Sequence, residues 1–211
     1  MVKTLTEWIV LLMTSMGYPG LALIMFLENV FPPIPSEIIL PLAGSLTIQG
    51  HFQLAGVTLV GAAGSVAGSW VFYALGRWVD ESRLRRLLQR YGKWLLLTEG
   101  DLDRSIAWFR RYGDWAVLIG RMIPVVRSLI SIPAGLAKMH WIKFTLLTAL
   151  GTLGWSLILA LSGRLLGHGW EMVSEVVGRF QDIVVIAIAA LLLAFVIRRL
   201  LAQRQKDGDH S

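Results

Sequence analysis

The chain has 211 residues, of which 55% are hydrophobic and 16% are charged, and it carries nine tryptophans. This composition is too apolar for an ordinary soluble domain and indicates a membrane protein. Because the chain has no cysteine, disulfides, thiolate nucleophiles and cysteine metal sites are excluded. The formal net charge of +6 suits nucleic acid or anionic lipid head groups, and the positions of the basic residues decide between them.

Residues 1–27 predict an N-terminal helix or a kinked span. An uncharged stretch runs from Trp8 to Leu27, which is long enough for a bilayer that needs about 20 residues. The tetrapeptide GYPG at 17–20 interrupts it, and glycine and proline kink or break helices. A kinked span and an interfacial helix both stay open. The opening residues show no small-residue cleavage site, so we expect them in the mature protein.

Three later segments are long and apolar enough to cross a hydrocarbon layer of roughly 30 Å. They are residues 52–78, 141–165 and 183–201. The predicted fold class is therefore an all-α polytopic membrane protein with additional terminal helices. Residues 202–211 are polar and predict a solvated tail.

The basic residues are concentrated in one loop and at the C-terminus. Nine of the 20 Lys and Arg lie in residues 77–112, and four follow Ile197. Cytoplasmic loops of membrane proteins carry such an excess. We therefore predict a cytoplasmic amphipathic segment at 79–112 and a cytoplasmic C-terminus, and we expect no nucleic-acid partner. A contact of residues 83–94 with anionic lipid is the alternative for this loop.

Two further stretches, residues 28–50 and 114–135, are apolar but interrupted by proline. Helix-breaking backbone at membrane depth is tolerated only where protein buries it or water reaches it. Both stretches therefore predict re-entrant hairpins, with surface loops as the alternative. The proline residues expected at the hairpin turns are Pro32, Pro33, Pro35 and Pro124.

The two hairpins and the spans that follow them resemble each other. YPGLALIMFLENVFPPIPSEIILPLAG and YGDWAVLIGRMIPVVRSLISIPAG share a tyrosine, an apolar arm, a proline turn and a final Ala-Gly. GSVAGSWVFYALGRWVD, from Gly64, resembles GTLGWSLILALSGRLLG, from Gly151. The first span leads into the basic loop and the second leads away from it. This predicts an inverted-topology repeat of a re-entrant hairpin plus a transmembrane helix, with the site near the midplane. Chance similarity of apolar segments is the alternative.

Four ionisable residues are expected at membrane depth: Glu28 and Glu37 in the first hairpin, and Arg121 and Arg127 in the second. At about 2.5–3.5 kcal/mol each, such charges must be paired or hydrated. Two guanidinium forks match phosphate geometry, so the arginines are predicted to bind phosphate. A carboxylate beside a bound phosphate is repelled unless it takes up a proton, so the glutamates are predicted to couple binding to protons. Two structural salt bridges between the hairpins are the alternative.

The motifs FLENVFPPIPSEIILPLAG and GRMIPVVRSLISIPAG resemble those of the DedA family, which shares the VTT (SNARE-associated) domain, over about residues 17–165. The resemblance implies a bacterial inner (plasma) membrane protein that moves lipid head groups, notably undecaprenyl phosphate, the polyprenyl phosphate carrier of cell-wall synthesis. Eukaryotic relatives are phospholipid scramblases. The sequence has Pro35-Ser36-Glu37 where some members have Pro-Gly-Asp. The acidic and arginine pairs of the family fall here on Glu28, Glu37, Arg121 and Arg127.

The sequence therefore predicts a multi-pass lipid transporter or flippase for undecaprenyl phosphate, with proton coupling as a hypothesis. A proton-coupled carrier and a general phospholipid scramblase are the alternatives in the same class, and a non-transporting scaffold with structural salt bridges is the alternative of another class. An enzyme, a metal and a cofactor are not expected, because the four histidines lack metal-ligand spacing and no serine pairs with a base. The predicted partners are membrane lipids, through polyprenyl phosphate or phospholipid head groups, and protons; a homo-oligomer is left open.

Overall fold

The computed structural model describes residues 2–30, 36–79, 82–86, 89, 99–124 and 126–208. In these residues the chain is almost entirely α-helical and forms no strand. Three helices are long and apolar enough to cross a bilayer: Leu54–Trp78, Trp141–Leu166 and Trp170–Arg198. The all-helical polytopic class predicted from the composition is thereby confirmed.

The first half of the chain contains α1 (Val2–Met16), α2 (Tyr18–Val30), α3 (Ser36–Leu46) and α4 (Leu54–Trp78). Gly17 separates α1 from α2 with a φ of +63°, a conformation that glycine adopts without strain. Pro19 lies in the first turn of α2, where its missing N–H costs no helical hydrogen bond. The interruption predicted at 17–20 is therefore a complete break between helices. Three of the predicted turn residues lie outside the described residues: Pro32, Pro33 and Pro35.

The second half contains α6 (Glu99–Gly120), α7 (Val126–Leu129), α8 (Ser131–Leu136), α9 (Trp141–Leu166), the 3-10 turn η1 (Gly167–Gly169) and α10 (Trp170–Gly208). A short helical segment at residues 82–86 precedes them. Helix α6 runs without interruption through residues 112–114, where the sequence analysis separated the amphipathic segment from the second hairpin. The physical reason is a buried face that continues across this boundary at helical spacing. That face consists of Ile106, Phe109, Gly113, Val117 and Gly120.

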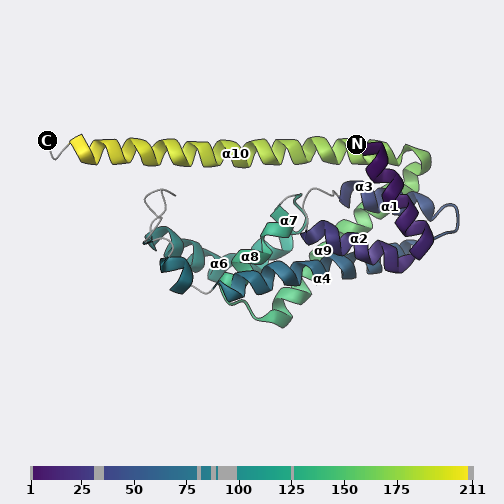
Figure 1. Ribbon diagram of the computed structural model, residues 1–211, viewed down its shortest axis with the longest axis horizontal. Coiled ribbons are helices and arrows are strands. Elements are labelled where there is room, and N and C mark those ends of the chain that lie inside the picture. The colour runs from purple at the N-terminus through teal and green to yellow at the C-terminus, as the bar shows by residue number, and fades with distance from the viewer. Residues whose placement is uncertain are drawn as a thin grey trace.

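Helix α10 begins at Trp170, well before the span expected at 183–201. Its first turns carry charged residues, and Arg179 donates to Glu175 at 2.6 Å, an i,i+4 pair of the kind that supports helix. Figure 1 shows α10 along one side of the molecule, with its C-terminal part projecting beyond the other helices. None of its most apolar stretch is buried, as suits a helix that faces lipid.

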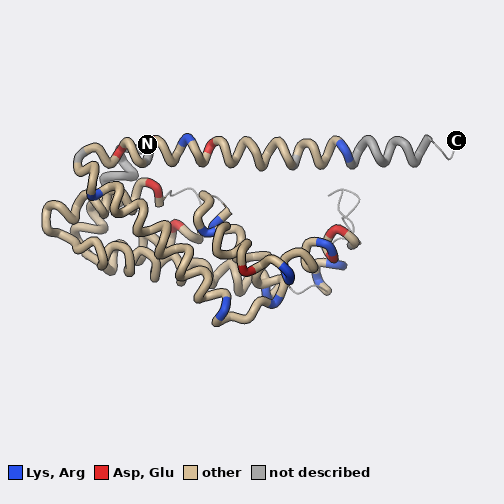
Figure 2. Tube along the Cα trace, turned by 180° about the vertical axis from the view of Figure 1, so that it is seen from behind, with Lys and Arg blue, Asp and Glu red and all other residues tan. Residues whose placement is uncertain are grey.

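Most Lys and Arg residues gather toward one end of the molecule (Figure 2). This end contains the last turn of α4, with Arg77, and the start of α6 (Figures 1 and 2). The basic end of the described part of α10 lies on the same side (Figure 2). Between its charged ends α10 has a long uncharged stretch, which is the part suited to the hydrocarbon layer.

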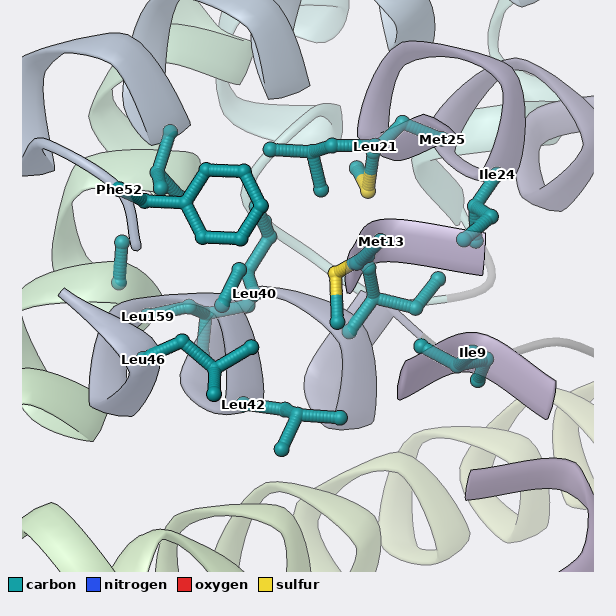
Figure 3. Packing of buried hydrophobic residues seen from close by; sticks show 14 residues of the cluster. Ile9, Met13, Leu21, Ile24, Met25, Leu40, Leu42, Leu46, Phe52 and Leu159 are labelled. Carbon is teal, nitrogen blue, oxygen red and sulfur yellow. The ribbon is translucent and has the colours of Figure 1, made fainter. Parts of the chain in front are cut away.

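The larger apolar core joins α1, α2 and α3 to parts of α4 and α9. Figure 3 shows Leu21 and Met25 from α2 and Met13 from α1 meeting Leu40 of α3, with Phe52 beside them. Leu40, Met13, Leu21 and Met25 are fully buried. The N-terminal helices are therefore packed onto α3 and help to hold it in place.

Helices α3 and α9 approach each other at backbone distance. A Cβ placed on Gly44 would meet the backbone of Ala160, and a Cβ on Gly163 would meet the backbone of Pro41. Small residues at such crossings let membrane helices pack closely. The pair of contacts positions α3, and with it Glu37, against the second long span.

An equivalent crossing joins α8 to α4. A Cβ on Gly135 would meet the backbone of Tyr73, and a Cβ on Gly76 would meet the backbone of Ile132. The glycines of α3 and α8 each complete an Ala-Gly, and those of α4 and α9 each precede an arginine. Each short helix thus packs on the long helix of the other half through glycines at matching positions of the sequence.

We predict that Gly163→Ala destabilises the protein, whereas Gly154→Ala does not. Position 154 has no neighbouring atom within 4 Å of a Cβ, so alanine there should only improve helix propensity, by up to about 1 kcal/mol. At position 163 the new methyl group would push α3 away, at a cost of about 1–3 kcal/mol. Thermal unfolding of both variants in detergent measures the difference, and equal stability of the two would contradict the close crossing.

Candidate functional site

The four charged residues predicted at membrane depth are all buried. Glu28, Glu37, Arg121 and Arg127 are 2%, 3%, 1% and 5% exposed. They come from separate segments: the end of α2, the first turn of α3, the residue after α6, and α7. Glu28 interacts electrostatically with all three of the others, so the structure brings the four together. We call this group the central charged site.

The closest contact in the central charged site is an ion pair between Glu28 and Arg127. Nη2 of Arg127 donates to Oε1 of Glu28, and both side chains are almost fully buried. The two residues are 99 positions apart, so this bond joins α2 to α7. Oε2 of Glu28 has no hydrogen-bond partner. The second carboxylate oxygen of Glu28 can therefore still accept a hydrogen bond.

Arg121 is held differently, by a neutral partner. Its Nη2 donates to Oγ of Ser131 at 2.7 Å, and its Cζ lies 5.8 Å from the centre of the Phe144 ring. Its Nε and Nη1 have no hydrogen-bond partner. Arg121 therefore has two N–H-bearing nitrogens that are buried and available to an anion.

Glu37 makes no ion pair within the described part of the chain, and its Oε1 has no hydrogen-bond partner. It lies in the first turn of α3, where the partial positive charge of a helix N-terminus favours a carboxylate. The structure therefore has one closed ion pair and two charges without a charged partner, instead of the two salt bridges weighed from the sequence. Pro124, the described turn proline, is buried in the turn between Arg121 and α7.

Polar contacts that the sequence analysis missed surround these charges. Ser131 is the hydrogen-bond partner of Arg121, and Nδ2 of Asn29 donates to Oγ of Ser65 at 2.7 Å. Asn29, Ser65 and Ser131 are each at most 1% exposed. A polar side chain inside an apolar stretch is the signal that could have found them, but serine is too common in membrane helices to stand out by itself.

An apolar groove of about 470 Å³ lies beside the central charged site, along α6 and the residues that follow it. Val126 and Ile130 line the groove, whereas the residues after them, Arg127 and Ser131, are buried in the polar interior. The segment that follows α6 thus has a polar side and an apolar side. The full lining is Trp108, Tyr112, Trp115, Ala116, Ile119, Gly120, Ile123, Val126 and Ile130.

Across the described residues, no group of three or more His, Asp and Glu side chains is arranged to hold a metal ion. The available chemistry of the central charged site is that of guanidinium, carboxylate and hydroxyl groups. Its formal charges are two positive and two negative. Such a site can accept an anion at the guanidinium groups if a carboxylate moves away or takes up a proton.

Comparison with known proteins identifies the family of this chain. The VTT domain matches residues 34–165, and the chain therefore belongs to the VTT-domain (DedA) family, as its motifs predicted. The match includes Glu37, Arg121 and Arg127, and Glu28 lies just before it. No solved structure gives a significant match.

Three relatives align with this chain over most of the length of both proteins. The alkaline phosphatase-like protein of Lactococcus lactis subsp. cremoris is 37% identical over 210 residues, 97% of this chain and 98% of the relative. Undecaprenyl phosphate transporter A of Staphylococcus aureus is 36% identical over 198 residues, 94% of this chain and 96% of the relative. The protein of that name from Bacillus subtilis is 36% identical over 188 residues, 89% and 91% of the two chains.

We predict that Glu28→Gln destabilises the protein and that Glu37→Gln does not. The first change leaves the buried Arg127 without its counter-charge, which costs about 3–5 kcal/mol in comparable buried pairs. The second removes a buried charge that has no ion-pair partner. Unfolding in detergent measures both, and the double variant Glu28→Gln/Arg127→Gln should lose less than the sum of its single changes. Equal losses for the two glutamates would contradict the pairing.

Proposed function

We propose that this protein is a membrane lipid transporter that moves undecaprenyl phosphate, or a closely similar polyprenyl phosphate, across the bacterial inner (plasma) membrane. The observation that carries the proposal is a buried arginine, Arg121, whose Nε and Nη1 lack partners in a chain built to cross a bilayer. A buried guanidinium in this state suits a phosphate oxygen better than any other common lipid group. The names of two relatives support the choice of lipid.

In this proposal the two arginines act in sequence. Arg121 has free donors and receives the phosphate first. Arg127 then exchanges Glu28 for the phosphate, which gives the anion a second guanidinium fork. The exchange leaves Glu28 next to an anion, and a proton on the carboxylate relieves the repulsion. Proton coupling follows from this charge balance, since the central charged site without its ligand has two charges of each sign.

We further propose that residues 28–50 and 114–135 are re-entrant hairpins in an inverted-topology repeat. The 11 residues of α3 span about 16 Å at 1.5 Å per residue, which is too short to cross a bilayer of roughly 30 Å. The matching glycine crossings of α3 with α9 and of α8 with α4 support a two-fold relation between the halves. Residues 52–78, 141–165 and 183–201 are then the spans.

The orientation and boundaries complete the proposed topology. Residues 79–112 and the tail at 202–211 are assigned to the cytoplasm, because the basic residues gather at one end of the molecule (Figure 2). Residues 1–27 are the N-terminal element, folded as α1 and most of α2. A homo-oligomer is compatible with the exposed apolar surface of α10, which lipid would also cover.

The apolar groove favours a lipid over a soluble anion as the ligand. A phosphate at Arg121 would sit on the polar side of the second hairpin, and the groove occupies its apolar side. Aromatic residues of α6, among them Trp108 and Trp115, line the groove. We assign the hydrocarbon tail to this groove and to the lipid around it, so that only the head group is taken from water into the protein.

Three other functions would give different results when the protein is assayed in liposomes. A phosphatase, as the name of the Lactococcus relative suggests, would release inorganic phosphate. A scaffold with structural salt bridges would move no lipid at all. A general scramblase would move phospholipids as well as polyprenyl phosphate and would not respond to a gradient.

We predict that the purified protein in liposomes moves labelled undecaprenyl phosphate between leaflets without releasing inorganic phosphate. Arg121→Lys should abolish this movement, because an ammonium group cannot replace a planar two-donor fork. Arg110→Lys is the matched control, since Arg110 is exposed. Loss of accessible lipid from one leaflet is the measurement. Full activity of Arg121→Lys would exclude the proposed phosphate site.

We also predict that an imposed pH gradient changes the transport rate of the native protein. In Glu28→Gln and Glu37→Gln the gradient should lose this effect, because glutamine cannot bind the proton that accompanies the phosphate. Rates with and without a gradient, at equal internal pH, test this. A native protein that ignores the gradient would remove proton coupling and leave passive lipid exchange.

A further inference from the structure

The interior face of α9 carries three hydroxyl side chains one helical turn apart, at Thr148, Thr152 and Ser156. They are 0%, 4% and 0% exposed, respectively. None of the three hydroxyl oxygens has a hydrogen-bond partner. We call these residues the hydroxyl row. Leaving buried hydroxyl groups unpaired costs stability, so packing alone does not account for the row.

Two other hydroxyl groups on the same helix donate hydrogen bonds to backbone carbonyls of that helix. Thr145 donates to the carbonyl of Trp141 at 2.8 Å, and Ser162 donates to that of Ile158 at 2.7 Å. This bond to the carbonyl four residues earlier is the ordinary solution for serine and threonine inside a helix. The residues of the hydroxyl row do not make it. Their hydroxyl groups are therefore available to a polar ligand in the protein interior.

The side chain of Arg121 lies along the hydroxyl row. A Cβ on Gly151 would meet Cβ and Cγ of Arg121 at 2.8 and 3.4 Å, and Cζ of Arg121 lies 5.8 Å from the Phe144 ring. Thr148 lies between these two points on α9, on the same helical face as Phe144. Thr148 is therefore next to the guanidinium whose Nε and Nη1 lack partners, and Thr152 is one turn further along.

The hydroxyl row faces the other long span, α4. Tyr73 stacks on Phe144 at one end with ring centres 4.5 Å apart, and Val57 shares a core cluster with Leu159 and Ala160 at the other end. The two helices therefore run in opposite directions along each other.

Ser65 is buried near the middle of α4, and Thr152 is buried near the middle of α9. Ser65 accepts a hydrogen bond from Asn29 at 2.7 Å, and Asn29 adjoins Glu28 of the central charged site. Oδ1 of Asn29 is also without a partner. Buried polar groups therefore lie on both α4 and α9, and they adjoin the central charged site through Asn29 on one side and Arg121 on the other.

We propose that Thr148 and Thr152, followed by Ser156, bind oxygen atoms of the phosphate group together with Arg121 and form the path by which it moves between α4 and α9. The inference rests on the proposed function and extends the phosphate site to α9, where no role had been assigned. Neutral hydroxyl donors hold an anion less tightly than a guanidinium does, which allows the phosphate to pass from one residue to the next. The recognised chemistry is a phosphate group, either as inorganic phosphate or as the phosphate monoester of a lipid.

The test replaces hydroxyl by methyl in Thr148→Val, Thr152→Val and the double variant, with Thr145→Val as the matched control on the same helix. Binding of farnesyl phosphate, a short polyprenyl phosphate, is measured with the full-length protein in nanodiscs, with farnesol and inorganic phosphate as comparison ligands. Each change in the hydroxyl row should weaken farnesyl phosphate binding about tenfold. Farnesol binding should not change. Thr145→Val should bind as the native protein does.

Thermal unfolding without ligand separates binding from structure. The valine variants of the hydroxyl row should unfold at the native temperature or above it, because an unpaired buried hydroxyl is replaced by an apolar group. Weaker binding with undiminished stability is the expected signature of a ligand site. Reduced stability in Thr148→Val and Thr152→Val, in proportion to lost binding, would show a structural role and overturn the inference.

The remaining outcomes keep this inference distinct from the proposed function. If Arg121→Lys loses farnesyl phosphate while the threonine variants keep it, the hydroxyl row is not part of the site and the proposed function stands. If the native protein binds farnesyl phosphate no better than farnesol, the proposed function fails, and the hydroxyl row fails with it. If the threonine variants lose farnesyl phosphate, the row is part of the site, and inorganic phosphate that competes with farnesyl phosphate identifies free phosphate as a second ligand. If inorganic phosphate does not compete, the row binds only lipid-linked phosphate.

Discussion

The buried ion pair between Glu28 and Arg127 is the interaction on which the rest of the site depends. Four charges in an apolar interior would cost on the order of 10 kcal/mol if nothing compensated them, which exceeds the stability of many proteins. Joining two of them removes much of that cost, and it can do so only if α2 and α7 meet. The requirement therefore links segments 99 residues apart and sets the position of α2 relative to α7.

The other two charges are compensated only in part, and this asymmetry is what makes the site chemically useful. Arg121 has a serine hydroxyl and an aromatic ring as neighbours, and Glu37 has the N-terminus of α3. Neither has an opposite charge bonded to it among the described residues. An arrangement selected only for stability would close both pairs or replace them with apolar side chains. A buried arginine whose N–H donors lack partners is instead typical of a site that binds an anion.

The glycine crossings explain how a polar interior can be built from such an apolar chain. Where α3 meets α9 and α8 meets α4, the backbones are in direct contact, so no large side chain is needed to fill these interfaces. The short helices can then carry their charged and hydroxyl residues to the centre of the molecule. The apolar residues face outward along α9, α10 and the groove of α6, where lipid satisfies them without any polar partner.

Composition and proline positions were sufficient to predict a membrane protein, and the resemblance of two motifs predicted its family. The four isolated charges pointed to the residues of the central charged site, because a charge in an apolar stretch is conspicuous in the sequence itself. The sequence could not decide that Arg127 pairs with Glu28 and that Arg121 binds Ser131, since both arginines lie in the same apolar stretch and nothing local assigns their partners. Nor could it separate Thr148 from Thr145, which look alike as threonines in an apolar helix. Only the tertiary structure decides these points, because burial and hydrogen-bond partners depend on which distant helices lie against each face. The continuity of α6 and the early start of α10 were missed for the same reason: packing of a helical face overrides the local breaks and charges that a sequence displays.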